Sequence, residues 1–368
     1  MTDKQLKGAV SLPGSKSESN RALMVAAYGG FPLEAENLSS AHDTFLMQTL
    51  LEKVKNVDRA EIDCEDAGTV SRFLMTYLAC RKGIWILTAK ARMRQRPMAP
   101  LIEALRGLGA EVECLGEEGF LPVRIKGRQL EGGSVVMDAS LSSQFASSLL
   151  MAAPTWEKGL RLRLKNAVSM PYIDLTLSVM RSFGAAVERV DDECLAIHHG
   201  SYCPCRFEVS PDWSAASYWY EMAALSERCD LLLKGASPAS QQGDAKVTEL
   251  FKTFGVASCP EALGVRIGKI ASERPRSPVA INLADTPDLF PAVFVTCVAL
   301  HVPARIQGIQ TLSYKESDRI QSLIAELSKL YHLECDINDH EIKLDSSLLM
   351  VDIPDKLAFC AHDDHRVV

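Results

Sequence analysis

The feature of this 368-residue chain that most constrains its fold is a helix pattern that recurs at long range. In five places a small or polar cluster opens a strongly apolar helix, and these openings are marked by Ser17, Gly68, Ser142, Ser214 and Asp288. The gaps between them are 51, 74, 72 and 74 residues. Their near-constant length predicts that one structural block is repeated along the chain.

A second series of helices interleaves with the first and ends in hydrophobe-glycine-small. Its members end at Gly109, Gly184 and Gly255, with gaps of 75 and 71 residues. Each glycine fits the left-handed position that closes a helix. Two interleaved series with the same spacing indicate a block that contains two helices.

The period is too long for a solenoid, whose units run to about 20–50 residues. Stretches rich in β-branched residues lie between the helices and predict strands over residues 61–67, 83–90, 122–127 and 134–140. Two helices and about four strands in each block predict an α/β fold of sheets and enclosed helices.

Extending the first series by 76 residues leads to Asp364, close to the end of the sequence. We therefore expect a sixth block to begin there and to break off, so that the sequence is truncated.

Composition narrows the class of protein. The chain is 47% hydrophobic and 24% charged, which is typical of a globular protein with two domains. It has no signal-peptide pattern, and its longest apolar run, residues 289–300, is too short to span a bilayer. Eleven scattered cysteines indicate reduced thiols, and a net charge of −7 gives no reason to expect nucleic-acid binding. We expect a cytoplasmic protein without nucleic-acid or membrane partners.

The stretch "LPGSKSESNRAL" brings glycine, serine and lysine together at a helix start. A nucleotide-binding P-loop needs G-x-x-x-x-G-K-[ST], and here Ser15 separates Gly14 from Lys16. The P-loop interpretation therefore fails. Lys16, Ser17 and Arg21 predict an anion site of another kind.

Cations recur near predicted helix starts, although the helix dipole disfavours them there. They are Lys16, Arg21, Arg72, Arg92, Arg94, Arg96, Lys315, Arg319 and Arg366. Repeated violation of a local rule is typical of a functional site, and such groups suit phosphates and carboxylates. The alternative is solvated surface charge.

Polar side chains at other helix starts have two interpretations. Ser142, Ser143, Gln144 and Ser169 would either cap helices or bind phosphate. Asp212, Asp288 and Glu316 are candidates for proton transfer, with helix capping as the alternative for the two aspartates. The adjacent residues 362–365 do not converge on one ion, and no HExxH or CxxC pair is present, so no metal site is expected.

Seven segments together resemble the 5-enolpyruvylshikimate-3-phosphate synthase family. They are "LPGSKSESNRAL", "DAGTVSRFL", "ARMRQRP", "SSQFASSLLMAAP", "SMPYIDLTL", "KESDRI" and "DDHRVV", and they cover essentially the whole chain in order. The resemblance implies a two-domain enolpyruvyl transferase fold (an inside-out α/β barrel) of βαβαββ units with the last unit incomplete. One domain would span residues 13–211 and the other 1–12 and 212–368, with the active site in the cleft between them.

The resemblance also implies the reaction. The enolpyruvyl group of phosphoenolpyruvate would move to the 5-hydroxyl of shikimate 3-phosphate by addition and elimination, with release of phosphate and without metal or organic cofactor. This is a step in the shikimate pathway, which leads through chorismate to the aromatic amino acids. The partners would be these two small molecules, and a monomer is expected.

Residue roles are carried over from the same resemblance. Phosphoenolpyruvate would contact Lys16, Gly68, Arg92, Gln144, Arg319 and Arg366. Shikimate 3-phosphate would contact Ser17, Arg21, Ser142, Ser143, Gln144, Ser169, Tyr172, Asp288 and Lys315. The catalytic residues would be Lys16, Asp288 and Glu316, the two carboxylates exchanging protons with the 5-hydroxyl and the enolpyruvyl methylene carbon.

Three features depart from the family pattern. Asp66 replaces the usual asparagine and adds negative charge near an anion site, and Thr311 stands where asparagine is common. The chain ends two residues after Arg366, without a later segment that bears a lysine. The alternatives that stay open are a non-catalytic anion-binding paralogue or inactive fragment, a scaffold without a small ligand, and an enolpyruvyl transferase that acts on a nucleotide sugar. No glycine-rich loop surrounds a cysteine, as the last would require.

Overall fold

The computed structural model describes residues 5–270, 275, 277–345, 349–350 and 356–367. The chain divides into two compact units. The central unit is Gly14–Val209, and the terminal unit combines Met1–Pro13 with Ser210–Val368. No helix within the described ranges is both long and apolar enough to cross a membrane.

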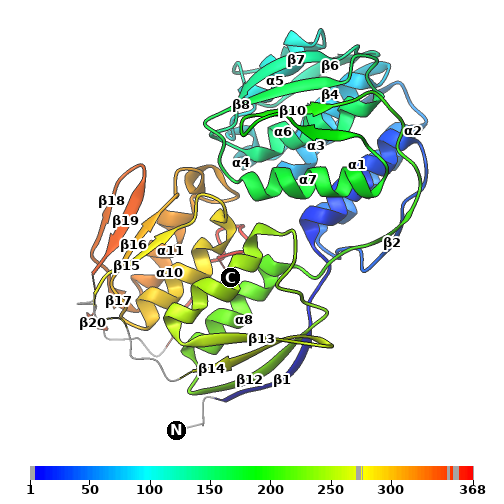
Figure 1. Cartoon of the computed structure of the whole chain (residues 1–368). Helices are drawn as coiled ribbons and strands as arrows, with labels where there is room; N and C mark the ends of the chain where they lie inside the picture. The colour runs from blue at the N-terminus through cyan, green and yellow to red at the C-terminus, as the bar shows by residue number, and fades with distance from the viewer. Residues whose placement is uncertain (1–4, 271–274, 276, 346–348, 351–355, 368) are drawn as a thin grey trace. The chain divides into compact units, whose positions relative to one another are not determined.

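The central unit alternates helices with short strands (Figure 1). Its first half contains α1 (Lys16–Gly29), β2 (Glu34–Glu36), α2 (His42–Lys55), β3 (Arg59–Asp63), α3 (Gly68–Cys80), β4 (Gly83–Thr88), α4 (Ala91–Arg94), α5 (Ala99–Gly107), β5 (Glu111–Cys114) and β6 (Val123–Gly127). Its second half contains β7 (Gly133–Asp138), α6 (Ser143–Ala152), the 3-10 turn η1 (Ala153–Thr155), β8 (Leu160–Lys165), α7 (Met170–Ser182), β9 (Val187–Arg189), β10 (Cys194–Ile197) and β11 (Arg206–Glu208).

Two four-stranded sheets of the central unit share one design. In the first, β3 runs parallel to β4, and β6 and β5 follow in antiparallel order. In the second, β7 runs parallel to β8, and β10 and β9 follow in antiparallel order. A helix connects each parallel pair, as parallel pairing requires. Each sheet therefore belongs to a βαβαββ unit.

The terminal unit begins with β1 (Gln5–Ser11) and resumes after the central unit (Figure 1). It continues with α8 (Trp213–Leu225), β12 (Arg228–Lys234), η2 (Gly243–Lys246), α9 (Val247–Leu250), η3 (Phe251–Phe254), β13 (Val256–Glu261) and β14 (Gly264–Lys269). It then contains β15 (Val279–Asn282), η4 (Pro287–Leu289), α10 (Phe290–Ala299), β16 (Ala304–Gln307), η5 (Leu312–Tyr314), α11 (Arg319–Leu327), β17 (Tyr331–His332), β18 (Cys335–Ile337), β19 (Glu341–Leu344) and β20 (Leu349–Met350).

The terminal unit repeats the same sheet design twice. One sheet has the order β1-β12-β14-β13 and the other β15-β16-β19-β18. Each again starts with a parallel pair and adds two antiparallel strands. Four sheets of one design confirm the repeated α/β block that the spacing of the helices predicts.

The apolar helices of the first series lie inside their units, as their sequences indicate. Ten of the thirteen residues of α3 are buried, and so are eight of the ten residues of α10. Each unit has its own hydrophobic core, with Phe73 and Phe145 in the central one and Phe290 and Phe294 in the terminal one. Burial of these large side chains is the main stabilising contribution of such cores.

The predicted helix-closing glycines are confirmed. Gly109, Gly184 and Gly255 have φ values of +88°, +87° and +77°, which a side chain would strain. The helix before Gly255 is not one continuous α-helix, because two 3-10 segments flank the single turn of α9.

Two other expectations differ in detail. The strand expected over 61–67 ends at Asp63, because the chain turns at Glu65 with a φ of +49°. Asp364, where a sixth block is expected to begin, lies in a turn.

Candidate active site

Each unit holds one group of the residues that the sequence singles out. The central cluster comprises Lys16, Ser17, Arg21, Gly68, Arg92, Ser142, Ser143, Gln144, Ser169 and Tyr172. The terminal cluster comprises Asp288, Lys315, Glu316, Arg319 and Arg366.

The central cluster is built at the starts of helices that pack together. Helices α1, α3, α6 and α7 contact one another within the central unit, as Figure 1 shows. Arg72 on α3 donates from Nη1 to Gln144 Oε1 on α6 at 2.6 Å. Gln144 Nε2 donates to Thr69 Oγ1 at 3.2 Å, back to α3. The Gln144 side chain is thus held in one orientation by two bonds to the neighbouring helix.

Arg21 joins α1 to α6 and α7 from a buried position, with only 2% of its surface exposed. Its guanidinium donates to Thr176 Oγ1 at 2.7 Å, to Ser147 Oγ at 3.4 Å and to the Tyr172 carbonyl at 3.2 Å. A further bond of 2.9 Å reaches the carbonyl of Ser17. Burial lowers the pKa of Arg21 to about 10, so the group stays charged at neutral pH. Arg21 therefore fixes the geometry of the residues around it.

Lys16 is the first residue of α1, where Ser15 caps the helix by accepting from the Glu18 amide at 3.4 Å. Lys16 Nζ lies 3.2 Å from Asp43 Oδ2. The preceding turn requires glycine, because a Cβ at Gly14 would lie 1.8 Å from the carbonyl oxygen of Asn37. The local sequence thus places Lys16 at a fixed helix start.

A second part of the central cluster surrounds the start of α3. A Cβ on Gly68 would lie 2.7 Å from Arg96 Nη1, so the buried Arg96 guanidinium lies directly against this backbone. Arg92 lies on the short helix α4 that leads to Arg96. Asp66, two residues before Gly68, has Lys90 Nζ at 3.2 Å as its ion-pair partner.

The capping alternative holds for some polar residues and fails for others. Ser142 caps α6 by accepting from the Gln144 amide at 3.2 Å, and Ser143 follows as the first residue of that helix. Ser169 precedes α7 in a left-handed conformation, with a φ of +57°, and its side chain does not cap the helix. Asp212 caps α8 by accepting from the Ala215 amide at 3.0 Å.

The terminal cluster converges on one carboxylate. Asp288 Oδ1 accepts from Arg319 Nη1 at 2.8 Å and from Lys315 Nζ at 3.3 Å. Asp288 Oδ2 accepts from Arg366 Nη2 at 3.0 Å. Asp288 makes no helix cap, since it lies inside η4 and its carboxylate is held by these three cations. Residues 78 positions apart in sequence are brought together here.

The charges of this cluster determine its protonation. Burial alone would raise the pKa of Asp288, but the positive charges of Arg366, Lys315 and Arg319 outweigh burial and hold that pKa well below its usual range. Burial likewise opposes the charge of Arg319, and the carboxylates of Glu316, Asp288 and Asp364 more than compensate, so that the pKa of Arg319 is raised. Asp288 and Arg319 are therefore both ionised.

Glu316 lies at the edge of the same cluster. Its Oε2 accepts from Arg319 Nη2 at 2.9 Å, and its side chain is 20% exposed. One guanidinium thus links the two candidate proton-transfer groups, Asp288 and Glu316.

Sequence reasoning missed the role of Asp364. Its buried carboxylate accepts from Arg319 Nε at 2.9 Å, from Ser317 Oγ at 3.1 Å and from the Arg366 amide at 3.0 Å. The pattern that reveals it is its position two residues before a functional arginine. Asp364 orients both Arg319 and Arg366.

Sequence reasoning also missed Asp244. This carboxylate is 2% exposed and accepts from the Ser214 hydroxyl. Burial and the charge of Asp288 raise its pKa to about 6. Nothing in the local sequence distinguishes it from a surface aspartate. Thr311, the other departure from the family pattern, is buried, and its hydroxyl has no hydrogen-bond partner among the described residues.

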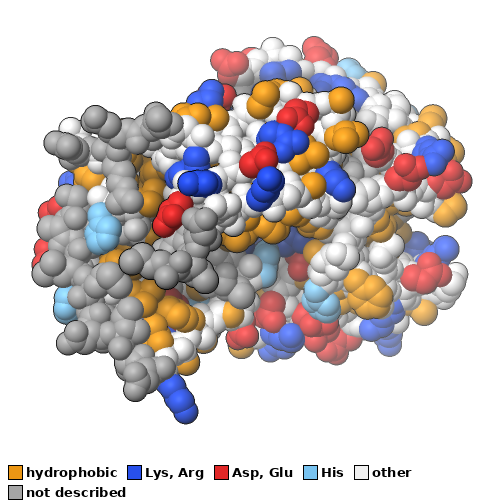
Figure 2. Space-filling model, turned by 90° about the horizontal axis from the view of Figure 1, so that it is seen from below, with side chains coloured by type: hydrophobic (Ala, Val, Ile, Leu, Met, Phe, Trp, Pro, Cys, Tyr) orange, Lys and Arg blue, Asp and Glu red, His pale blue; other side chains and the backbone are white. Residues whose placement is uncertain are grey.

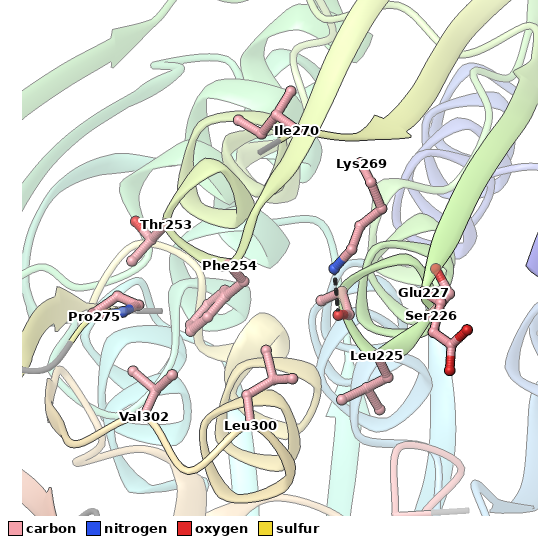
Figure 3. Close-up of a pocket in the computed structure, with 11 residues that line it drawn as sticks. Leu225, Ser226, Glu227, Thr253, Phe254, Lys269, Ile270, Pro275, Leu300 and Val302 are labelled. Carbon is pink, nitrogen blue, oxygen red and sulfur yellow. Dashed lines mark hydrogen bonds between the residues drawn. The ribbon is translucent and has the colours of Figure 1, made fainter. Parts of the chain in front are cut away.

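Cavities inside the units lie apart from both clusters. One of about 350 Å³ in the terminal unit is shown in Figure 3, with Phe254, Leu300 and Val302 in its wall. Lys269 points its ammonium at the Ala224 carbonyl at the end of α8, at 2.7 Å, and so serves to cap that helix. Another cavity, of about 500 Å³, lies between α1 and α2. Neither is lined by a residue of the two clusters.

The surface gives little sign of a single-charge patch. Figure 2 shows Lys and Arg side chains interspersed with Asp and Glu on the face in view. Among the described residues, no group of three or more His, Cys, Asp or Glu side chains is arranged to hold a metal ion.

Comparison with known proteins adds to this geometry. A family model described as EPSP synthase (3-phosphoshikimate 1-carboxyvinyltransferase) matches residues 1–368. A 3-phosphoshikimate 1-carboxyvinyltransferase of Bacteroides fragilis is 40% identical over 364 residues, which are 99% of this chain and 87% of the relative. One of Methanospirillum hungatei is 31% identical over 87% of this chain and 79% of its own.

Solved structures agree on the fold. An EPSP synthase of Acinetobacter baumannii superimposes with a TM-score of 0.70 at 23% identity, over 99% of this chain and 88% of that one. The enolpyruvyl transferase NikO of Streptomyces tendae superimposes with a TM-score of 0.71 at 16% identity, over 94% and 83%. The predicted α/β enolpyruvyl transferase fold is confirmed by these likenesses.

Proposed function

Because the chain belongs to the EPSP synthase (3-phosphoshikimate 1-carboxyvinyltransferase) family, we propose that it transfers the enolpyruvyl group of phosphoenolpyruvate to the 5-hydroxyl of shikimate 3-phosphate. The hydroxyl oxygen bonds to C2 of phosphoenolpyruvate while C3 takes a proton. Loss of phosphate and of a C3 proton then restores the double bond in the product. The chain is thus an enzyme of the shikimate pathway.

The two clusters divide the binding of the substrates in this proposal. Lys16, Gly68, Arg92, Gln144, Arg319 and Arg366 bind phosphoenolpyruvate. Ser17, Arg21, Ser142, Ser143, Gln144, Ser169, Tyr172, Asp288 and Lys315 bind shikimate 3-phosphate. Both substrates are anions that repel each other, and preorganised cations offset that repulsion.

The observation that supports this best is the convergence of Lys315, Arg319 and Arg366 on Asp288. Three cations around one carboxylate keep Asp288 ionised, as a base must be before it accepts a proton. When an anionic substrate binds the same cations, their charge is shared and the pKa of Asp288 rises. The carboxylate then becomes a stronger base for the 5-hydroxyl only once the substrate is in place.

Glu316 supplies the second proton-transfer group. Its bond to Arg319 connects it to the same cations, and its partial exposure leaves it accessible to a ligand. Two carboxylates in different environments divide acid and base roles. We assign Asp288 to the 5-hydroxyl and Glu316 to the methylene carbon, with Lys16 as the third catalytic group.

The proposal is tested by measuring phosphate release with both substrates together and with each alone. Release that requires both establishes the transfer. Binding of shikimate 3-phosphate without release would instead identify a non-catalytic anion-binding protein. A monomeric state and a cytoplasmic location stay predictions, which a sedimentation measurement and cell fractionation would check.

A further inference from the structure

The approach to Arg366 is strained. His362 and Asp363 are consecutive residues other than glycine, and their φ values are +53° and +54°. A left-handed conformation costs such residues roughly 1–2 kcal/mol each, and it persists only where the surroundings impose it. Contacts in the terminal unit must therefore hold this turn, which immediately precedes Asp364 and Arg366.

One buried carboxylate provides those contacts. Glu326, which is 7% exposed, accepts from the Cys360 amide at 2.9 Å through Oε2, and its Oε1 lies 2.8 Å from His362 Nε2. Lys329 Nζ donates to the same Glu326 at 2.6 Å and to the Ala358 carbonyl at 2.9 Å. Hydrogen bonds from Lys329 and from the Cys360 amide lower the pKa of Glu326 to about 2, so it stays a carboxylate at neutral pH.

Glu326 shares its face of α11 with an active-site residue. It lies seven positions after Arg319, which is two helical turns, so both side chains project from the same side of the helix. Arg319 binds Asp364 at one end of this face, and Glu326 binds residues 360 and 362 at the other. The segment 358–366 is thus fastened to α11 at two points on either side of the strained turn.

We propose that Glu326 is a positioning residue which, by fixing residues 358–362 to α11, holds Arg366 against Asp288. The proposal rests on the proposed function, in which Arg366 binds phosphoenolpyruvate. Glu326 does not touch the reacting atoms. It acts through the backbone of the turn, whose strain would otherwise relax and release the 3.0 Å contact of Arg366 with Asp288.

The test compares Glu326→Gln with a matched control. The control is Glu249→Gln on α9, where Glu249 pairs with Lys252 at 2.6 Å and at the same three-residue spacing as Glu326 and Lys329. We expect Glu326→Gln to raise the KM for phosphoenolpyruvate about tenfold, the size expected when one charge-assisted hydrogen bond is lost. The KM for shikimate 3-phosphate should change less than about twofold, as should both constants in the control.

Action through Arg366 is tested by repeating the change in an Arg366→Lys background. There Glu326→Gln should add less than about a twofold effect, because the two residues act as one unit. An equal effect in both backgrounds, or an equal rise in both KM values, would overturn the proposal.

A readout without activity separates this proposal from the proposed function. In Glu326→Gln the backbone amides of residues 360–367 should exchange hydrogen at least about tenfold faster than in the original chain, while those of α10 stay unchanged. His362→Ala, which removes only the bond to Oε1, should show a smaller increase. Absence of phosphate release in the original chain would sink the proposed function alone, whereas unchanged exchange in Glu326→Gln would sink the positioning role.

Discussion

The ammonium of Lys90 lies 3.2 Å from a carboxylate oxygen of Asp66, two residues before the start of α3 at Gly68. Lys90 also lies 3.2 Å from Glu65, and its own amide donates to the Glu65 carbonyl at 3.0 Å. The additional negative charge of Asp66, which departs from the family pattern, therefore has a local counter-charge. The pairing connects the loop before Gly68 with the segment that carries Arg92.

From this pairing we predict an asymmetric pair of variants. Lys90→Ala should raise the KM for phosphoenolpyruvate about threefold, because two uncompensated carboxylates then lie near an anion site, and exposed pairs contribute little more than this. Asp66→Asn should leave that KM unchanged or lower it, and the double variant should return close to the original value. Steady-state kinetics at low and at high salt check this, since screening should shrink the effect. A loss that persists in the double variant would mean that Lys90 contributes something other than charge compensation.

Glu316 allows a test of the proton-transfer assignment. Glu316→Gln keeps the shape of the side chain and an acceptor for Arg319, but it removes the proton-transfer capacity. We expect turnover to fall by about a hundredfold or more, while both KM values change by less than about threefold. Glu334→Gln, at an exposed position of the same unit, is the control. Normal turnover in Glu316→Gln would make this residue structural.

Asp244 makes stability depend on pH. Its pKa in the folded chain is raised to about 6 by burial and by the charge of Asp288, above the ordinary value of 3.8. Between about pH 4 and pH 6 the folded chain holds a proton that the unfolded chain has released, so the free energy of unfolding falls as pH rises through this window. At pH 8 the full cost of the ionised, buried group remains.

Asp244→Asn should remove that cost. The amide oxygen still accepts from Ser214, and we expect the free energy of unfolding at pH 8 to rise by about 2 kcal/mol, given about 1.4 kcal/mol per pKa unit. Urea unfolding between pH 4 and pH 8 checks this, with the exposed Asp339→Asn as control. A stability gain of equal size at pH 4 would point to packing and not to charge.

The repeated blocks could be predicted from sequence because their signals are local. A glycine such as Gly184 that ends a helix, or an apolar run such as that of α10, carries its meaning within a few residues. The cations could be found for the same reason, since Lys16 and Arg319 violate a rule about helix starts. The resemblance to a family then assigned their roles.

The supports of the site could not be found in this way. Asp364 binds Arg319 from 45 positions away, and Glu326 binds the Cys360 amide from 34 positions away. Such pairs depend on how α11 packs, and neither carboxylate has a distinctive local pattern. The same holds for Asp244, whose raised pKa comes from burial that only the folded chain creates.

Arg21 provides the sharpest test of how far the central cluster depends on internal bonds. Its buried guanidinium makes four hydrogen bonds, to Thr176, Ser147 and the carbonyls of Tyr172 and Ser17, and its carbon atom lies 5.6 Å from the centre of the Phe73 ring. Arg21→Ala leaves a cavity and several acceptors without donors, and we expect it to lower the free energy of unfolding by about 3 kcal/mol.

The control for this change is Arg59→Ala at an exposed position of β3, which should alter stability by less than about 0.5 kcal/mol. Urea unfolding in the absence of substrates measures both variants, so the result does not depend on whether Arg21 also contacts shikimate 3-phosphate. Equal stability of Arg21→Ala and the original chain would show that the internal bonds contribute nothing net. The buried cation would then have to be explained by substrate binding alone.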